Sequence, residues 1–229
     1  MGEDVEFPSN GSTGGGYLAP AADGAGLGVV VIQEWWGLVP HIRDVCDRLA
    51  TEGFTALAPD LYHGHTVAPG EPDEAAKAAM GLDIERAARD MAGATEYLAG
   101  HEAVRGNGLG VVGFCMGGSL ALYLATVRPD LVKAAVPFYG IPRRDRDPDW
   151  SRLEAAVEGH YAEDDDMAGP AVAADLEERL TALGKEVRMF VYPGTHHAFF
   201  NDTRPEVYDA DAARQAWIRT LEFLRSKLG

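Results

Sequence analysis

The sequence contains only two cysteines, Cys46 and Cys115, among 229 residues. So few cysteines exclude the disulfide framework of a small secreted protein and leave room for one reactive thiol. No apolar run approaches the roughly 18 residues that a membrane-spanning helix needs. The first residues, MGEDVEFPSNG, lack the basic and apolar regions of a secretory signal. We therefore expect a cytoplasmic protein.

Basic residues are also scarce, because 20 Lys and Arg against 36 Asp and Glu give a formal net charge of −16. Nucleic-acid phosphates are bound by clustered Lys and Arg, so this balance argues against such a partner. Close-spaced metal motifs such as CxxC or HExxH are absent from the sequence, and we expect neither a metal nor a cofactor. The expected partner is a small molecule, bound by a monomer or a weak homodimer.

Apolar, β-branched runs alternate with segments of helical periodicity along the chain. This alternation is typical of βα units around a mostly parallel sheet with helices on both faces, and one α/β domain of 1–229 can hold them. The expected strands cover 28–33, 55–61, 109–114, 132–138, 155–161 and 187–192. The expected helices cover 41–52, 73–98, 117–127, 170–183 and 208–228, and GSTGGG at 11–16 is expected to form a hairpin turn.

The motif with the most specific chemistry is GFCMGG at 113–118, which follows an expected strand and precedes an expected helix. It is a G-x-S-x-G nucleophile elbow with Cys in place of Ser, and its glycines allow strand and helix to approach closely. The helix dipole favours a thiolate there, and the backbone amide of Met116 can stabilise an oxyanion. We expect Cys115 to be the nucleophile. Cys46 lies on the apolar face of a helix and is expected to be a core thiol.

Proteins with this elbow arrange their triad along the chain as nucleophile, acid and histidine. The acid is therefore expected after a later strand, where residues 163–166 read Glu-Asp-Asp-Asp. The spacing from the preceding small residue Ala162 selects Asp165, while Asp164 is one step away and Asp166 also stays open.

The histidine of the triad is expected after the last strand, where residues 193–199 read PGTHHAF. His197 is the expected general base, because a His followed by a small residue and Phe is the pattern of a catalytic histidine, and His196 occupies the position before it. The remaining histidines have no comparable context and are expected to be structural or solvent-facing: His41, His63, His65, His101 and His160.

A third motif, QEWWG at 33–37, follows the strand at 28–33, where open sheets bind their ligands. Trp35 and Trp36 can form the apolar wall of a substrate pocket, and the backbone amide of Trp35 can be the second oxyanion donor. A Glu34 carboxylate beside the nucleophile disfavours a thiolate, whereas the helix end and the histidine favour it. This competition can keep Cys115 protonated until substrate binds.

Together, VVVIQEWWGLVPHIRDVCDRLATEGFTALAPDLYHG, GFCMGG and GTHHAFFND resemble the dienelactone hydrolase family, over nearly the whole chain. The resemblance implies the α/β-hydrolase fold and a triad of Cys115, Asp165 and His197. It also matches Glu34 to an acid that moves between the nucleophile and an arginine during activation. The expected function is hydrolysis of small lactones or esters through a thioester acyl-enzyme.

The chain departs from the family at the arginines that hold the substrate carboxylate. Four residues after His197, where the resemblance implies one arginine, the sequence has Asn201, and Arg204 follows three residues later. We expect Asn201 and Arg204 to contact substrate. Arg86 and Arg89 are the candidates for the second arginine. The expected substrate is therefore a small lactone or ester other than dienelactone.

Two other functions remain open. A hydrolase scaffold can serve as a non-catalytic ligand-binding protein, although this chain keeps all three triad residue types together with Glu34. A reactive cysteine at a helix N-terminus also suits a thiol redox sensor. The second function lacks a resolving cysteine, since Cys46 is expected in the core.

Overall fold

The computed structural model describes residues 2–9 and 11–229. Within this part of the chain, eight strands form one sheet in the order β1-β2-β4-β3-β5-β6-β7-β8. They are β1 (Glu3–Ser9), β2 (Ser12–Ala19), β3 (Gly26–Ile32), β4 (Phe54–Pro59), β5 (Val104–Phe114), β6 (Val132–Phe138), β7 (Ala156–Asp164) and β8 (Val187–His196). β2 pairs antiparallel with β1 and β4, and the other neighbours run parallel. The mostly parallel sheet is thus confirmed.

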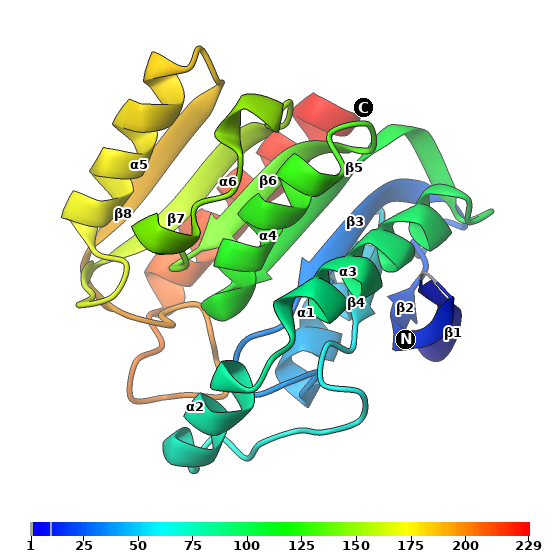
Figure 1. Cartoon of the computed structure of the whole chain (residues 1–229), viewed down its shortest axis with the longest axis horizontal. Helices are drawn as coiled ribbons and strands as arrows, with labels where there is room; N and C mark the ends of the chain where they lie inside the picture. Colours follow the sequence, from blue (N-terminus) through cyan, green and yellow to red (C-terminus); the bar gives the residue numbers. More distant parts are fainter. Residues whose placement is uncertain (1, 10) are drawn as a thin grey trace.

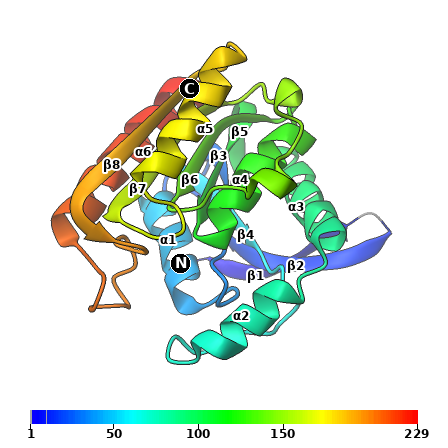
Figure 2. The same ribbon diagram turned by 60° about the vertical axis from the view of Figure 1, so that its left-hand side comes forward.

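Helices cover both faces of this sheet (Figure 1). They are α1 (Pro40–Thr51), α2 (Pro72–Met80), α3 (Ile84–Ala99), α4 (Met116–Val127), α5 (Pro170–Ala182) and α6 (Ala210–Leu228). α1 and α6 pack on one face, and α3, α4 and α5 on the other, as the turned view shows (Figure 2). None of these helices in the described residues has the length and apolar character of a membrane-spanning segment.

The central strands are buried on both faces, which explains their continuous apolar sequences. Every residue of β4 is buried, and β3 and β6 each have only one residue that is not. Parallel strands covered by helices on both sides have this pattern. Cys46 lies in the core between α1 and the sheet, as predicted.

The helix expected over 73–98 is two helices, α2 and α3. α2 ends at Met80 with Gly81 as its C-cap, and α3 begins after Asp83, whose side chain accepts a hydrogen bond from the amide of Arg86. An N-cap aspartate stabilises the start of a helix, so a new helix begins there. The apolar periodicity continues across the break, which is why the sequence pattern suggests a single helix.

The glycines at 14–16 lie in a strand and not in the expected hairpin turn. The pairing of β1 with β2 runs from Glu3 opposite Leu18 to Ser9 opposite Ser12. A Cβ atom on Gly16 would lie 2.6 Å from the carbonyl oxygen of Ala58 in β4. The glycines therefore permit close packing between strands, and the turn lies before them.

The strand directions bring the candidate residues to one edge of the sheet. β3, β5, β7 and β8 are parallel to their neighbours in the sheet, so their carboxyl ends lie on the same side. Cys115 directly follows β5, Asp165 directly follows β7, and His197 directly follows β8. Ligands of open α/β sheets bind at this edge.

Candidate active site

Cys115 lies in a sharp turn between β5 and α4. Its φ is 55° and its ψ is −120°, which few residues other than glycine adopt. A Cβ atom on Gly113 would lie 2.0 Å from the carbonyl oxygen of Gly117, and one on Gly117 would lie 2.4 Å from that of Gln33. Any side chain at either position would collide with backbone, so the turn requires these glycines. The backbone amide of Cys115 donates to the carbonyl of Phe138 and holds the turn in place.

Asp165 is held rigidly against His197. Its Oδ2 atom lies 2.6 Å from Nδ1 of His197, and its Oδ1 atom accepts hydrogen bonds from the backbone amides of Met167 and Ala168. Burial alone would raise the pKa of Asp165, but the hydrogen bonds from His197 and the two amides lower it below its usual value. Asp165 therefore stays ionised and fixes the orientation of the His197 ring.

The other nitrogen of His197 is available to the nucleophile. Its Nε2 atom is buried and has no hydrogen-bond partner of normal geometry among the described residues. Burial disfavours the charged imidazole, yet interactions with Asp165 and with the nearby thiol of Cys115 prevail and raise the pKa of His197 to about 10. The surroundings of His197 therefore favour its imidazolium form.

The alternatives at the neighbouring positions lie elsewhere. His196 and Asp164 are both exposed, and Nδ1 of His196 lies 4.0 Å from Oδ2 of Asp164. Asp166 is exposed as well. Of the three aspartates considered from the sequence, only Asp165 meets His197.

Glu34 is buried next to these residues. Its Oε2 atom accepts a hydrogen bond of 2.8 Å from Nδ2 of Asn201. Burial raises the pKa of Glu34 above its usual value, although the charges of His41 and His197 oppose this effect. Burial therefore favours the protonated form of Glu34 more than that of an exposed glutamate.

Asn201 is buried beside Glu34, and its expected contact with substrate stays a prediction. The residue is 2% exposed, and its carboxamide is engaged at both ends. Nδ2 donates to Glu34, while Oδ1 accepts hydrogen bonds from the backbone amide and the hydroxyl of Thr203. The side chain lies behind Glu34 and serves as its partner.

The two tryptophans of the QEWWG motif have different neighbours. Trp36 is buried and packs against Val67 and against Ala75 of α2, and its expected place in the wall of a substrate pocket stays a prediction. Trp35 is only partly buried, and its backbone amide makes no hydrogen bond within the described residues. Met116 is the first residue of α4, where backbone amides lack an intrahelical acceptor. The amides of Trp35 and Met116 therefore remain the candidate oxyanion donors.

Arg204 lies near the site, and the other two candidate arginines lie on α3. The charge of Arg204 lowers the pKa of Glu34, and its Nε atom donates to Glu206 at 2.9 Å. Arg86 and Arg89 lie on α3 and are largely exposed. Of the three candidate arginines, Arg204 is thus the one whose charge acts on Glu34 beside the candidate triad.

Three residues of the site were not predicted from the sequence. Tyr139 is buried with a φ of 37°, its ring lies 5.1 Å from that of His197, and its hydroxyl has no partner among the described residues. The hydroxyl of Tyr62 donates to the carbonyl of Trp35, and burial raises the pKa of Tyr62 to about 12. His41, expected to be structural or exposed, is buried and affects Glu34. Tyr139 directly follows β6, and this position at the sheet edge was the only available signal.

Similar proteins are found by sequence and by structure. Residues 15–228 match the model of the dienelactone hydrolase family. The chain is 37% identical to "Protein usf" of Aquifex pyrophilus and 33% identical to "Putative carboxymethylenebutenolidase" of Aquifex aeolicus, each over 234 residues that cover 100% of both proteins.

A crystal structure from Klebsiella pneumoniae, titled as that of a "Putative Dienelactone Hydrolase", is similar with a TM-score of 0.84. It is 29% identical, and the superposition covers 98% of each chain. The fold is thus that of the α/β-hydrolases. With a family model that matches 15–228, and relatives of at least 30% identity over its full length, this chain belongs to the dienelactone hydrolase family and is a carboxymethylenebutenolidase-like hydrolase.

Proposed function

We propose that this hydrolase cleaves small lactones or esters with Cys115 as its nucleophile, through a thioester acyl-enzyme. The observation that carries the proposal is the strained turn that places Cys115 beside His197, whose other ring nitrogen is bound to the buried Asp165. Nucleophile, base and orienting acid are the parts that covalent acyl transfer needs.

In the first half of the proposed reaction, His197 holds the proton of the Cys115 thiol, and the thiolate attacks the carbonyl carbon of the substrate. The backbone amides of Trp35 and Met116 donate hydrogen bonds to the oxyanion that forms. The bond between the carbon and the leaving oxygen then breaks, and His197 gives its proton to that oxygen. A thioester on Cys115 remains, and the alcohol of a lactone stays attached to it.

In the second half, neutral His197 takes a proton from a water molecule, which attacks the thioester carbon. The tetrahedral intermediate collapses, the Cys115 sulfur leaves as a thiolate, and the product is a carboxylic acid that ionises. His197 is then protonated again, so the imidazolium–thiolate pair is restored. Asp165 stays ionised throughout and keeps the ring in one orientation.

Glu34 is proposed to tune the nucleophile and not to attack substrate. The family resemblance implies an acid that moves between the nucleophile and an arginine. In this chain the hydrogen-bond partner of Glu34 is the amide of Asn201, so we propose that Asn201 takes the arginine's place. A neutral donor holds a carboxylate less firmly than a guanidinium, which leaves Glu34 more mobile.

The redox-sensor hypothesis has less support than hydrolysis. Cys46 is completely buried, and burial raises the pKa of its thiol far above the usual value. A thiol in this environment is a poor resolving partner for an oxidised Cys115. The non-catalytic hypothesis does not account for the pairing of His197 with Asp165.

The proposed nucleophile can be tested with iodoacetamide and a chromogenic ester such as p-nitrophenyl acetate. Alkylation should occur at Cys115 and abolish hydrolysis, and Cys46→Ala should be alkylated and inactivated in the same way. Cys115→Ser should retain little activity, because a hydroxyl is a weaker nucleophile in a site suited to a thiol. Full activity of Cys115→Ala would refute the proposal.

A further inference from the structure

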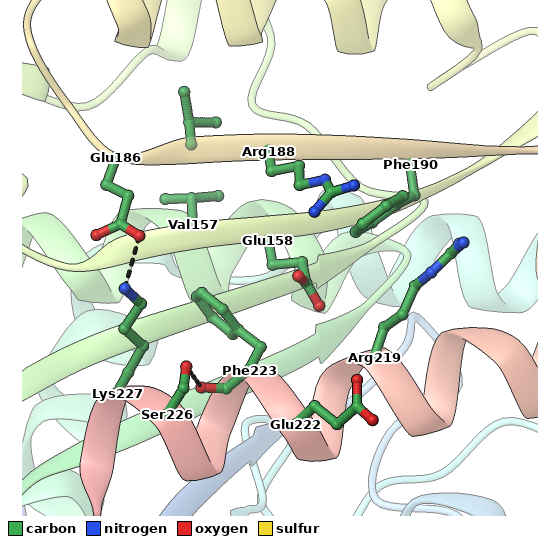
Figure 3. A pocket seen from close by; sticks show the side chains of 11 residues that line it. Val157, Glu158, Glu186, Arg188, Phe190, Arg219, Glu222, Phe223, Ser226 and Lys227 are labelled. Atoms are coloured by element: carbon green, nitrogen blue, oxygen red, sulfur yellow. Dashed lines mark hydrogen bonds and ion pairs between the residues drawn. The ribbon is translucent and has the colours of Figure 1, made fainter.

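A groove of about 660 Å³ lies between α6 and the edge strand β8 (Figure 3). Glu158, Arg188 and Phe190 line it from the sheet, and Arg219 and Phe223 line it from the helix. The groove is at the amino-terminal halves of β7 and β8, whereas the proposed triad is at their carboxyl ends. None of the residues proposed for catalysis lines it, so it is separate from the candidate active site.

Two arginines in the groove lack a carboxylate partner. The guanidinium carbons of Arg188 and Arg219 lie 4.4 Å and 4.1 Å from the ring centroid of Phe190. Arg219 also donates a hydrogen bond to the hydroxyl of Tyr192. Neither arginine forms an ion pair within 4.0 Å across residues 2–9 and 11–229, although acidic residues outnumber basic ones by 36 to 20. Stacking on a ring orients a guanidinium while leaving its N–H edge for an anion.

Glu158 supplies the negative charge that faces these arginines. It is 9% exposed, and its Oε1 atom has no hydrogen-bond partner among the described residues. Burial raises the pKa of Glu158 to about 7; the charges of Arg188 and Arg219 oppose this, while that of Glu222 on α6 adds to it. His160 lies 3.8 Å from Oε1, but burial and the charge of Arg219 lower the pKa of His160 to about 3, so it is neutral at pH 7.

The groove therefore has two charge states near neutral pH. With Glu158 ionised, the arginines have a carboxylate nearby that balances part of their charge. With Glu158 protonated, that charge is gone and the carboxyl group adds a hydrogen-bond donor; the remaining carboxylates of the lining are Glu222 and Glu186, and Glu186 pairs with Lys227. An anion entering the groove thus favours the protonated state of Glu158.

We propose that this groove is a second ligand site, which binds a small organic carboxylate with a flat apolar body. The planar guanidiniums of Arg188 and Arg219 match the geometry of a carboxylate and can bind it with paired hydrogen bonds. The apolar body lies against Phe223 and Val157, which line the same groove. An inorganic anion has no apolar part that could pack against these two residues.

The binding is linked to a proton. Because the carboxylate binds more tightly when Glu158 is protonated, its affinity rises as the pH falls through about 7 and then levels off. The change is at most about tenfold per pH unit, since one proton is taken up. A carboxylate that bound only through general charge attraction would show no such step.

Isothermal titration calorimetry of the full-length protein with benzoate at pH 6 and pH 8 tests the proposal. Benzoate should bind more tightly at pH 6, by about three- to tenfold, while neutral benzamide and inorganic phosphate should bind at least about tenfold more weakly. The affinity should be unchanged after alkylation of Cys115, which fills the other site. Equal binding of benzamide, equal binding of phosphate, or loss of binding on alkylation would overturn it.

Variants locate the site in the groove. Arg188→Gln and Arg219→Gln should each weaken benzoate binding by about tenfold or more, because each removes a charged donor pair. Arg152→Gln is the matched control, since it removes the same charge from an exposed arginine outside the groove, and it should bind as the unmodified protein does. Glu158→Gln should bind benzoate equally at pH 6 and pH 8. Unchanged affinity in both arginine variants, or a persistent pH step in Glu158→Gln, would refute the site.

Discussion

Two histidine–aspartate pairs lie at the carboxyl ends of β7 and β8, one residue apart in each. Nδ1 of His197 lies 2.6 Å from Oδ2 of Asp165, and these side chains are 21% and 1% exposed. Nδ1 of His196 lies 4.0 Å from Oδ2 of Asp164, and these side chains are 59% and 60% exposed. The pairs share residue types and sequence spacing, so they differ only in their surroundings.

The loop backbone explains this difference. Asp164 and His196 are register partners at the ends of β7 and β8, where their side chains point to solvent. One residue after His197, Ala198 adopts a φ of 69°, and the chain turns inward to the buried Phe199. Solvent screens the interaction between His196 and Asp164, whereas burial strengthens the interaction between His197 and Asp165. We therefore expect burial, and not residue type, to decide which pair performs acid–base chemistry.

The largest expected effect is the difference between the two histidines. His197→Ala should lower kcat/KM for a chromogenic ester by about 10²-fold or more, because it removes the proposed acid and base. His196→Ala should stay within about threefold of the unmodified enzyme, since its side chain is 59% exposed and its interaction with Asp164 is screened by solvent. A comparable loss of kcat/KM in both variants would show that the buried pair of His197 and Asp165 has no particular role in the reaction.

The two aspartates should differ in the pH dependence as well as in the rate. Asp165→Asn should lower kcat/KM by about 10²-fold, and Asp164→Asn should have little effect. Asp165 contributes to raising the pKa of His197 to about 10, so activity that needs the imidazolium is lost as the pH rises through that value. Without Asp165 this loss should move to lower pH. The assignment of Asp165 as the partner of His197 would be contradicted if the alkaline loss of activity occurred at the same pH in Asp165→Asn as in the unmodified enzyme. It would also be contradicted if that loss moved to another pH in Asp164→Asn.

Asn201 and Glu34 form another buried polar pair next to the candidate triad. Asn201→Ala should lower the free energy of unfolding by about 1–3 kcal/mol, because it leaves Glu34 buried without its hydrogen-bond donor. Urea denaturation measures this change. Adding Glu34→Gln, which removes the negative charge, should recover part of the loss. An unchanged free energy of unfolding in Asn201→Ala would mean that Glu34 finds another partner.

The smallest expected effect concerns Arg204. Its side chain already donates to Glu206, so Arg204→Ala should reduce the ratio of kcat/KM between an anionic lactone and its neutral methyl ester by less than about tenfold. We expect this ratio to be low in the unmodified enzyme, because Asn201 is not a carboxylate-binding arginine. A strong preference for the anion that disappears in Arg204→Ala would name Arg204 as the substrate-binding residue.

Much of the fold follows from local patterns in the sequence. Continuous apolar runs indicate the buried strands β3, β4 and β6, and the glycines of GFCMGG indicate a strand–turn–helix junction. The break between α2 and α3 was missed, because apolar periodicity does not report a capping aspartate. The glycines of β2 were misassigned, because their close approach to β4 depends on strand pairing that the local sequence does not show.

Only those residues of the candidate site that belong to a sequence motif could be predicted. Cys115, Asp165 and His197 each follow a strand directly, so topology and residue type together select them. The contact of Asn201 with Glu34 was not predicted, because it joins residues 167 positions apart. Tyr139 and His41 carry no motif, and their places beside the site depend on tertiary packing.

The most direct test of the central claim is mass spectrometry of the acyl-enzyme. The enzyme is mixed with an excess of p-nitrophenyl acetate, quenched in acid during the burst and mapped by peptides. The proposed mechanism predicts one acetyl group on the peptide that contains Cys115 and none on the peptide that contains Cys46. Acetyl groups on another residue, with Cys115 unmodified during the burst, would contradict a thioester mechanism.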